Sequence, residues 1–200
     1  MKEHPLALKI KPYMSEKRYI HTLGVVKMAE KLSRYCLPDK RDALVAAAFL
    51  HDISKELSFD EQKRILACEG VTLDGDEMNS PEIFHSFTAP YVIKRDFPEY
   101  ASEEILNAVR YHTVGDVDMT VFDEIIFLSD YIEEGRVYQS CIDLRNYVLE
   151  NMGDDIIANV VCLHNAALRS IEATERVLLA KGKRVSKRTA LVKKSLASKI

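Results

Sequence analysis

Six side chains in this sequence are of types that bind divalent metal ions, and they are spread over much of the chain. Two of them are adjacent, in the dipeptide His51-Asp52. Each alone has an ordinary explanation, because a histidine or aspartate inside a protein usually finds a polar partner. Buried together, they would destabilise the fold unless a cation compensated them. The set comprises His21, His51, Asp52, His85, His112 and Asp130.

A pair of metal ions accounts for this set better than a single ion does. Neutral imidazoles with ionised carboxylates favour iron, manganese or zinc over magnesium, which prefers oxygen ligands. One four-coordinate zinc would leave some of the six unused. Two ions would share a bridging carboxylate, and Asp52 is the predicted bridge. Such a pair lowers the pKa of a bridging water and clamps phosphoryl oxygens, which is the chemistry of a phosphohydrolase.

The elements that must position these side chains have helical patterns, which predict an all-α fold. A helix over 15–35 carries His21 on the same face as its apolar residues. The stretch 43–50 is apolar on every side, which is typical of a helix at the centre of a domain, and it ends at His51-Asp52. Further helices are predicted over 58–70, from about 88, over 102–111, from 120, over 138–152 and over 155–180.

Local signals fix where two of these helices begin. Thr120 with Asp123 can cap the helix that carries the last of the six side chains. Pro90 is expected in the first turn of a helix that begins near Thr88, because proline is tolerated there. His85 is therefore expected just before that helix.

The composition is that of an ordinary globular protein. The chain has 200 residues, 47% of them hydrophobic and 30% charged, with a formal net charge of -3. This balance gives no reason to expect a membrane or nucleic-acid partner. Residues 1–11 lack an apolar signal segment. The four cysteines form no C-x-x-C motif and are expected to be reduced, which favours a cytoplasmic location.

The composition changes after residue 180. Residues 181–200 contain eight Lys or Arg and no acidic residue. We therefore expect a catalytic domain over 1–180 and a basic C-terminal tail over 181–200. A solvated tail is favoured over an electrostatic contact with an anionic partner, because chain ends are often disordered.

The order of the six side chains resembles the H…HD…H…H…D signature of the HD superfamily, whose members are helical, metal-dependent phosphohydrolases and phosphodiesterases. Over about residues 14–168 the sequence is similar to the YqeK family. It departs from that family at Ser86, Val114 and Glu134, where Gly, Thr and Pro are usual. The similarity is carried by Arg18-Tyr19-Ile20-His21-Thr22-Leu23-Gly24-Val25, Leu50-His51-Asp52-Ile53-Ser54-Lys55, Val109-Arg110-Tyr111-His112-Thr113 and Ser129-Asp130-Tyr131-Ile132-Glu133-Glu134-Gly135-Arg136.

The resemblance implies an HD-domain helical bundle over 1–180 and a bacterial enzyme that hydrolyses diadenosine tetraphosphate, or a related dinucleoside polyphosphate, symmetrically to two ADP. It also implies two iron ions, and a homodimer is expected. A metal-bridging hydroxide would attack an inner phosphorus atom. Matched by motif, one ion would be held by His21, His51, Asp52 and Asp130, and the other by Asp52, His85 and His112.

A tetraphosphate carries several negative charges, so cations are needed beyond the metals. Lys55 and Arg18 each lie one helical turn from a predicted ligand, and Arg136 lies just past the last one. The predicted catalytic residues are His51, Asp52, Lys55 and Arg18, and the predicted substrate-binding residues are Arg18, Lys55, Thr113 and Arg136.

Two other functions remain open at this point. The first is an HD-type nucleotidase or phosphodiesterase that acts on another nucleotide. The second is a regulatory module in which the HD fold only binds a nucleotide, and the basic tail is its only support in the sequence. The complete set of six metal-binding side chains argues against the second, because a binding module has no need of them.

Overall fold

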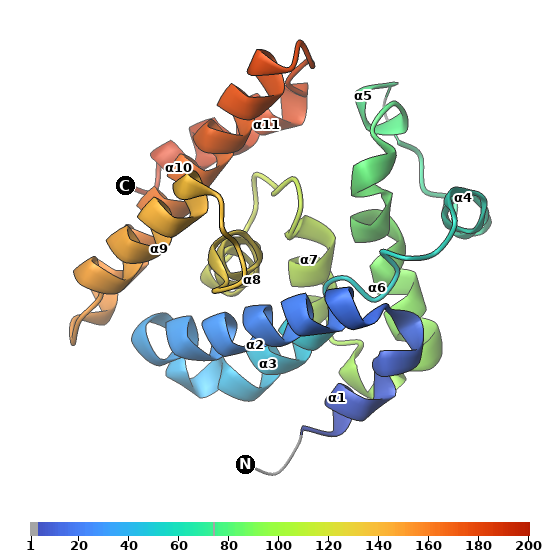
Figure 1. Cartoon of the computed structure of the whole chain (residues 1–200), viewed down its shortest axis with the longest axis horizontal. Coiled ribbons are helices and arrows are strands. Elements are labelled where there is room, and N and C mark those ends of the chain that lie inside the picture. The colour runs from blue at the N-terminus through green and yellow to red at the C-terminus, as the bar shows by residue number, and fades with distance from the viewer. Residues whose placement is uncertain (1–3, 74) are drawn as a thin grey trace.

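The computed structural model describes residues 4–73 and 75–200, which form helices joined by short connections, with no strand in those two ranges (Figure 1). The predicted all-α fold is confirmed. Within the described part, no helix has the length and apolar character needed to cross a bilayer. The α-helices are α1 (Pro5–Lys9), α2 (Glu16–Cys36), α3 (Arg41–Leu50), α4 (Phe59–Cys68), α5 (Gly75–Met78), α6 (Phe84–Asp96), α7 (Glu103–Tyr111), α8 (Val121–Ile132), α9 (Gln139–Asn151), α10 (Ile156–Ala180) and α11 (Lys187–Ala197).

Helices α2 and α3 pack side by side and carry the first two metal-binding motifs (Figure 1). The side chain of Ser15 accepts a hydrogen bond from the backbone N–H of Arg18 and so begins α2. One face of α2, which includes Val25 and Leu32, is buried in the core. Residues 44–50 of α3 are buried on all sides, as the apolar stretch predicts. The end of α3 therefore delivers its polar groups to the interior.

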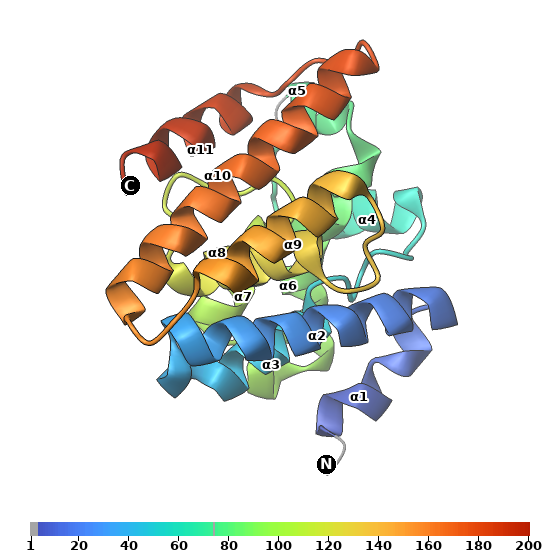
Figure 2. The same ribbon diagram turned by 60° about the vertical axis from the view of Figure 1, so that its left-hand side comes forward.

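Helix α8 occupies the middle of the bundle, where α2, α7 and α10 pack around it (Figures 1 and 2). The side chain of Thr120 accepts from the N–H of Asp123, and the Asp123 carboxylate accepts from the N–H of Thr120. These two reciprocal hydrogen bonds form the capping box that the sequence predicts at the start of the helix. Nearly all of α8 is buried, and Asp130 lies in its last turn. A carboxylate in this position faces the interior because the helix has neighbours around it.

The predicted start of the helix that contains Pro90 is wrong. Helix α6 begins at Phe84, so His85 lies in its first turn and Pro90 lies in its interior. No side chain caps α6, and a short 3-10 turn over Pro81–Ile83 leads into it instead. The sequence therefore lacks the polar start signal that marks α2, α4, α7 and α8. Most residues of α6 around Pro90 are buried, and this packing stabilises the helix in spite of the proline in its interior.

The expectation of a solvated tail after residue 180 is also wrong. Residues 187–197 form α11, which folds back along α10 (Figure 2). Val192 and Leu196 are buried in a small apolar cluster with Phe127 of α8 and Ile171 of α10. Burial of these side chains stabilises the segment against the bundle. The division of the chain into domains at residue 180 stays a prediction.

Candidate metal centre

Asp52 lies at the centre of the predicted site, just past the end of α3. Its Oδ2 atom lies 3.5 Å from Nε2 of His51 and 3.9 Å from Nε2 of His21. Its Oδ1 atom lies 3.2 Å from Nε2 of His85 and 3.6 Å from Nε2 of His112. The two oxygens of one carboxylate therefore face two different groups of imidazoles, as a bridging ligand would.

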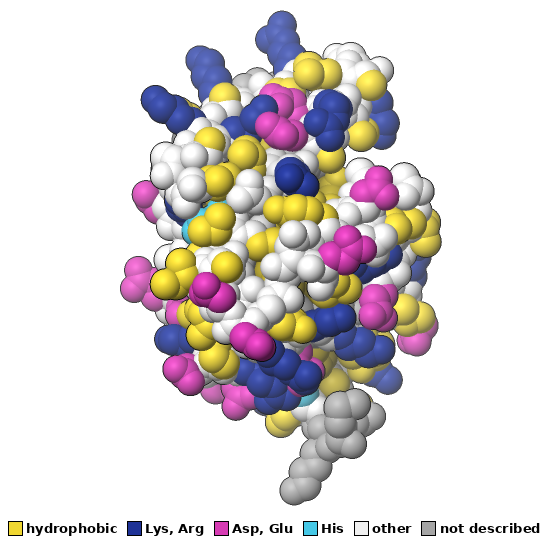
Figure 3. Space-filling view, turned by 90° about the vertical axis from the view of Figure 1, so that its left-hand side faces the viewer, with side chains coloured by type: hydrophobic (Ala, Val, Ile, Leu, Met, Phe, Trp, Pro, Cys, Tyr) yellow, Lys and Arg dark blue, Asp and Glu magenta, His cyan; other side chains and the backbone are white. Residues whose placement is uncertain are grey.

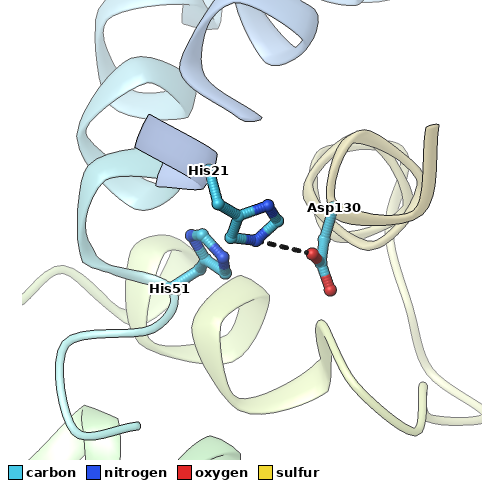
Figure 4. A group of neighbouring side chains, drawn as sticks. All are labelled: His21, His51 and Asp130. Carbon is cyan, nitrogen blue, oxygen red and sulfur yellow. Dashed lines mark ion pairs between the residues drawn. The ribbon is translucent and has the colours of Figure 1, made fainter. Parts of the chain in front are cut away.

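One group consists of His21, His51 and Asp130, which come from α2, the end of α3 and α8 (Figure 4). Nε2 of His21 lies 3.0 Å from Oδ1 of Asp130. Each of the three residues offers a ligand atom, and these atoms lie within 4.8 Å of one another. One cation at ordinary ligand distances could contact all three.

The second group consists of Asp52, His85 and His112, which come from the end of α3, the first turn of α6 and the end of α7. Nε2 of His85 lies 3.1 Å from Nε2 of His112, and both are close to the same Asp52 oxygen. His51 also falls within reach of this group. The hydroxyl of Thr113 lies 3.1 Å from His85 and 3.0 Å from His112, so Thr113 is part of the same surface.

Backbone carbonyls orient two of the imidazoles. Nδ1 of His51 lies 2.7 Å from the carbonyl oxygen of Ala48, and Nδ1 of His112 lies 2.6 Å from that of Val109. Each Nδ1–H donates to its carbonyl, which leaves the Nε2 lone pair directed into the cluster, an arrangement common among metal-binding histidines. Nε2 of His51 is buried and has no hydrogen-bond partner among the described residues. A divalent metal would satisfy this atom, so the side chains present fit the ions that the sequence predicts.

The electrostatics of the cluster favour a bound divalent cation. Burial raises the pKa of Asp52, but the neighbouring imidazoles outweigh it and hold the pKa well below its ordinary value. Burial lowers the pKa of His85 to about 4, which keeps that imidazole neutral. Burial also lowers the pKa of His21, but hydrogen bonds to Asp130 and Glu133 outweigh it and raise the pKa to about 9. The carboxylates that favour a proton at His21 would equally favour a divalent cation there.

Each of the three predicted cations contacts one of the predicted metal ligands. Thr113 borders the same cluster, so all four residues that are predicted to bind substrate lie within reach of a phosphate held there. Nη1 of Arg18 lies 2.6 Å from Oδ2 of Asp52, Nζ of Lys55 lies 3.0 Å from Nδ1 of His85, and Nη2 of Arg136 lies 2.5 Å from Oδ1 of Asp130.

Glu133 is a site residue that the sequence reasoning missed. Its buried carboxylate lies 3.2 Å from Nδ1 of His21 and accepts a hydrogen bond from the backbone N–H of Gly135. Gly24 of α2 makes room for it, because a Cβ atom at Gly24 would collide with Oε2 of Glu133. The available signal was its position three residues after Asp130, just past the end of α8.

A cavity of about 660 Å³ lies beside the cluster. His112, Thr113 and Asp130 line it on the side of the cluster, while α10 and residues 183, 184, 186, 188 and 189 line it farther away. Its volume lies within the range of pockets that hold small organic ligands. Of the predicted substrate-binding residues, Thr113 lines this cavity, whereas Arg18, Lys55 and Arg136 are not among its lining.

Comparison with known proteins agrees with this geometry. Residues 18–135 match the HD domain family. The chain is 32% identical over 151 residues to a symmetrical bis(5'-nucleosyl)-tetraphosphatase of Bacillus subtilis, covering 76% of this chain and 80% of that protein. A protein of the same name from Halalkalibacterium halodurans is 30% identical over 156 residues, with the same coverage.

A crystal structure from Clostridium acetobutylicum is also similar. It is described as a "predicted HD superfamily hydrolase involved in NAD metabolism". The TM-score is 0.83 at 25% sequence identity, and the match covers 98% of this chain and 96% of that one. The shared HD domain and the sequence identity over most of the chain settle the family. The chain belongs to the HD-domain family and, within it, to the symmetrical bis(5'-nucleosyl)-tetraphosphatases whose motifs the sequence resembles.

Proposed function

We propose that this chain hydrolyses diadenosine tetraphosphate, and related dinucleoside polyphosphates, symmetrically to two nucleoside diphosphates. The observation that carries the proposal is the placement of Asp52, whose two carboxylate oxygens face two separate groups of imidazoles. That arrangement is suited to two metal ions, and two ions are suited to phosphoryl transfer. The names of the relatives supply the substrate.

The proposed metal ligands are the six side chains predicted from the sequence. His21, His51, Asp52 and Asp130 would hold one ion, and Asp52, His85 and His112 the other. Bound divalent ions would lower the pKa of a water molecule and neutralise charge on the phosphates. We propose iron as the metal, as the family resemblance implies. Mixed imidazole and carboxylate ligands favour borderline transition metals, so manganese or zinc would also suit them.

The reaction consumes one water molecule. Its oxygen forms a bond to one of the two inner phosphorus atoms, and the bond from that phosphorus to the oxygen joining the two inner phosphates breaks. The products are two ADP molecules, each with a terminal phosphate. Arg18, Lys55 and Arg136 border the cluster, where their positive charges would stabilise the charge that develops on the phosphate oxygens.

The test is to identify the products by chromatography after incubating the metal-loaded protein with diadenosine tetraphosphate. ADP is expected as the only nucleotide product. The Asp52→Asn variant keeps the shape of the side chain but removes its charge, and should lower turnover by more than about 100-fold. AMP together with ATP would contradict symmetrical cleavage. Turnover of a different nucleotide alone would support the nucleotidase alternative, and unchanged activity of Asp52→Asn would contradict the metal-dependent mechanism.

We further propose that the protein works in a reducing compartment such as the cytoplasm. Its four cysteines are free, and three of them are buried. Buried free thiols are usual where disulfides do not form. The homodimer stays a prediction that size-exclusion chromatography with light scattering would check.

A further inference from the structure

The basic C-terminal segment forms the wall of the cavity that lies away from the predicted metal ligands. Helix α10 ends in a Schellman motif, in which the N–H of Gly182 donates to the carbonyl of Leu179 and the N–H of Lys183 donates to that of Leu178, both at 2.9 Å. Gly182 has a φ of 68°, a conformation that favours glycine. This turn reverses the chain, so that the segment after it runs back beside α10 (Figure 2). Five residues of the returning segment line the cavity: Lys183, Arg184, Ser186, Arg188 and Thr189.

Ion pairs at both ends of the returning segment hold this wall in place. Arg188 pairs with Asp116 at 2.7 Å and with Glu77 at 2.9 Å. Near the C-terminus, Nζ of Lys199 lies 2.8 Å from the fully buried carboxylate of Glu124. Between these ion pairs, the apolar side chains of α11 pack against α8 and α10. The segment is therefore a docked part of the molecule, able to present side chains to a ligand in fixed positions.

One cation of this wall is available to a ligand. Lys183 pairs with Glu82 at 3.0 Å, and Arg188 is engaged as described. Arg184 lines the cavity, is exposed, and has no hydrogen bond or ion pair with another described residue. Lys and Arg side chains gather on the surface at the end of the molecule where α10 turns into α11 (Figure 3). An anionic group in the cavity would therefore meet an uncompensated guanidinium.

The rest of the lining suits a nucleoside. Tyr131 and Leu178 offer apolar surface for a base. The hydroxyls of Ser170 and Thr174 donate to backbone carbonyls of α10, and each can still accept a hydrogen bond from a ribose hydroxyl. At its other end the cavity is lined by two of the predicted metal ligands, His112 and Asp130. A nucleotide in this cavity would thus place its inner phosphate at the cluster and its nucleoside in the apolar, hydroxyl-lined space, with the phosphate attached to the ribose between them.

We propose that this cavity binds one nucleoside-phosphate half of the substrate and that Arg184 pairs with the phosphate attached to its ribose. The inference deepens the proposed function and rests on it. It assigns the C-terminal segment a direct part in substrate binding, and Arg184 a part in determining affinity for dinucleoside polyphosphates. Removal of Arg184 should weaken binding of a nucleotide but not of a nucleoside.

The test is calorimetric titration of the full-length, metal-loaded protein with ADP and, separately, with adenosine. The dissociation constant for ADP should rise about three- to fivefold in Arg184→Ala, as expected for loss of one exposed ion pair, while that for adenosine stays within twofold. Lys187→Ala removes an exposed cation of the same segment that does not line the cavity, and should leave both constants unchanged. Thermal unfolding curves of the three proteins check that the variants are folded.

Three results would overturn the inference: ADP binding by Arg184→Ala equal to that of the wild type, an equal loss of adenosine binding, or no ADP binding by the wild type. A second variant, Leu178→Trp, should weaken binding of both ligands by filling the cavity, and unchanged binding would also contradict the assignment. Hydrolysis is measured separately. A wild type that binds ADP but does not cleave diadenosine tetraphosphate would overturn the proposed function, while the titrations would still decide the role of Arg184.

Discussion

Glu133 supports the cluster of predicted metal ligands through its contact with His21. Its carboxylate is 3% exposed and lies against the Nδ1 atom, on the side of the ring that points away from Asp130. Carboxylates in this position fix the orientation of a metal-binding imidazole and raise its basicity. The geometry therefore makes Glu133 a positioning residue.

Glu133→Gln should lower metal affinity by about 10- to 100-fold, because it removes the charge behind His21. The measurement is a metal titration of the purified variant, with Glu134→Gln as the matched control, since Glu134 is the exposed neighbour. Gly24→Ala should act in the same direction by displacing the Glu133 carboxylate. Gly153→Ala, which adds a Cβ atom in open space, should have no effect. Equal affinities of the Glu133 and Glu134 variants would contradict this role.

The six predicted side chains could be found from the sequence because their types are rare together inside a helical protein. Glu133 could not be separated from Glu134 in the same way, since the two are adjacent and chemically identical. Only the end of α8 at Ile132 turns one inward and leaves the other exposed. The contacts of the cations were equally hidden, because they depend on how α2, α6 and α8 approach one another.

Helix α8 carries Asp130 into the cluster, and its start depends on the reciprocal bonds between Thr120 and Asp123. Thr120→Ala should lower the free energy of unfolding by about 1 kcal/mol, because it leaves backbone N–H groups of the first turn without an acceptor. Urea denaturation followed by circular dichroism measures this change. Thr120→Ser keeps the hydroxyl and should retain most of the stability. A Thr120→Ala variant as stable as the wild type would show that packing alone holds the start of α8.

Capping residues allowed the starts of several helices to be predicted, whereas the starts of α6 and α11 were missed. No side chain caps α6, and Ser186, which caps α11, lies in a segment that was expected to be solvated. Pro90 suggested a start near Thr88, but tertiary packing buries α6 from Phe84 onward and overrides the local signal. The residues after 180 were expected to be solvated because of their charge. Only two of their apolar side chains, Val192 and Leu196, are buried, and these are too few to reveal a packed helix until α10 lies beside them.

For the molecule as a whole, the C-terminal helix is part of the folded unit. Leu196→Ala should lower the free energy of unfolding by about 2 kcal/mol, since Leu196 is 1% exposed within the cluster formed by α8, α10 and α11. Leu191→Ala is the matched control, because Leu191 is 57% exposed on the same helix. If both variants unfolded at the wild-type urea concentration, α11 would be undocked in solution.

The most direct test of a two-metal centre is the number of ions that one chain binds. Titration of metal-free protein with Fe²⁺ or Mn²⁺, without oxygen, should give two bound ions per chain for the wild type. Asp52→Ala, which removes the carboxylate shared by both groups, should bind neither ion with wild-type affinity. A wild type that binds a single ion, or an Asp52→Ala variant that still binds two with unchanged affinity, would contradict the account.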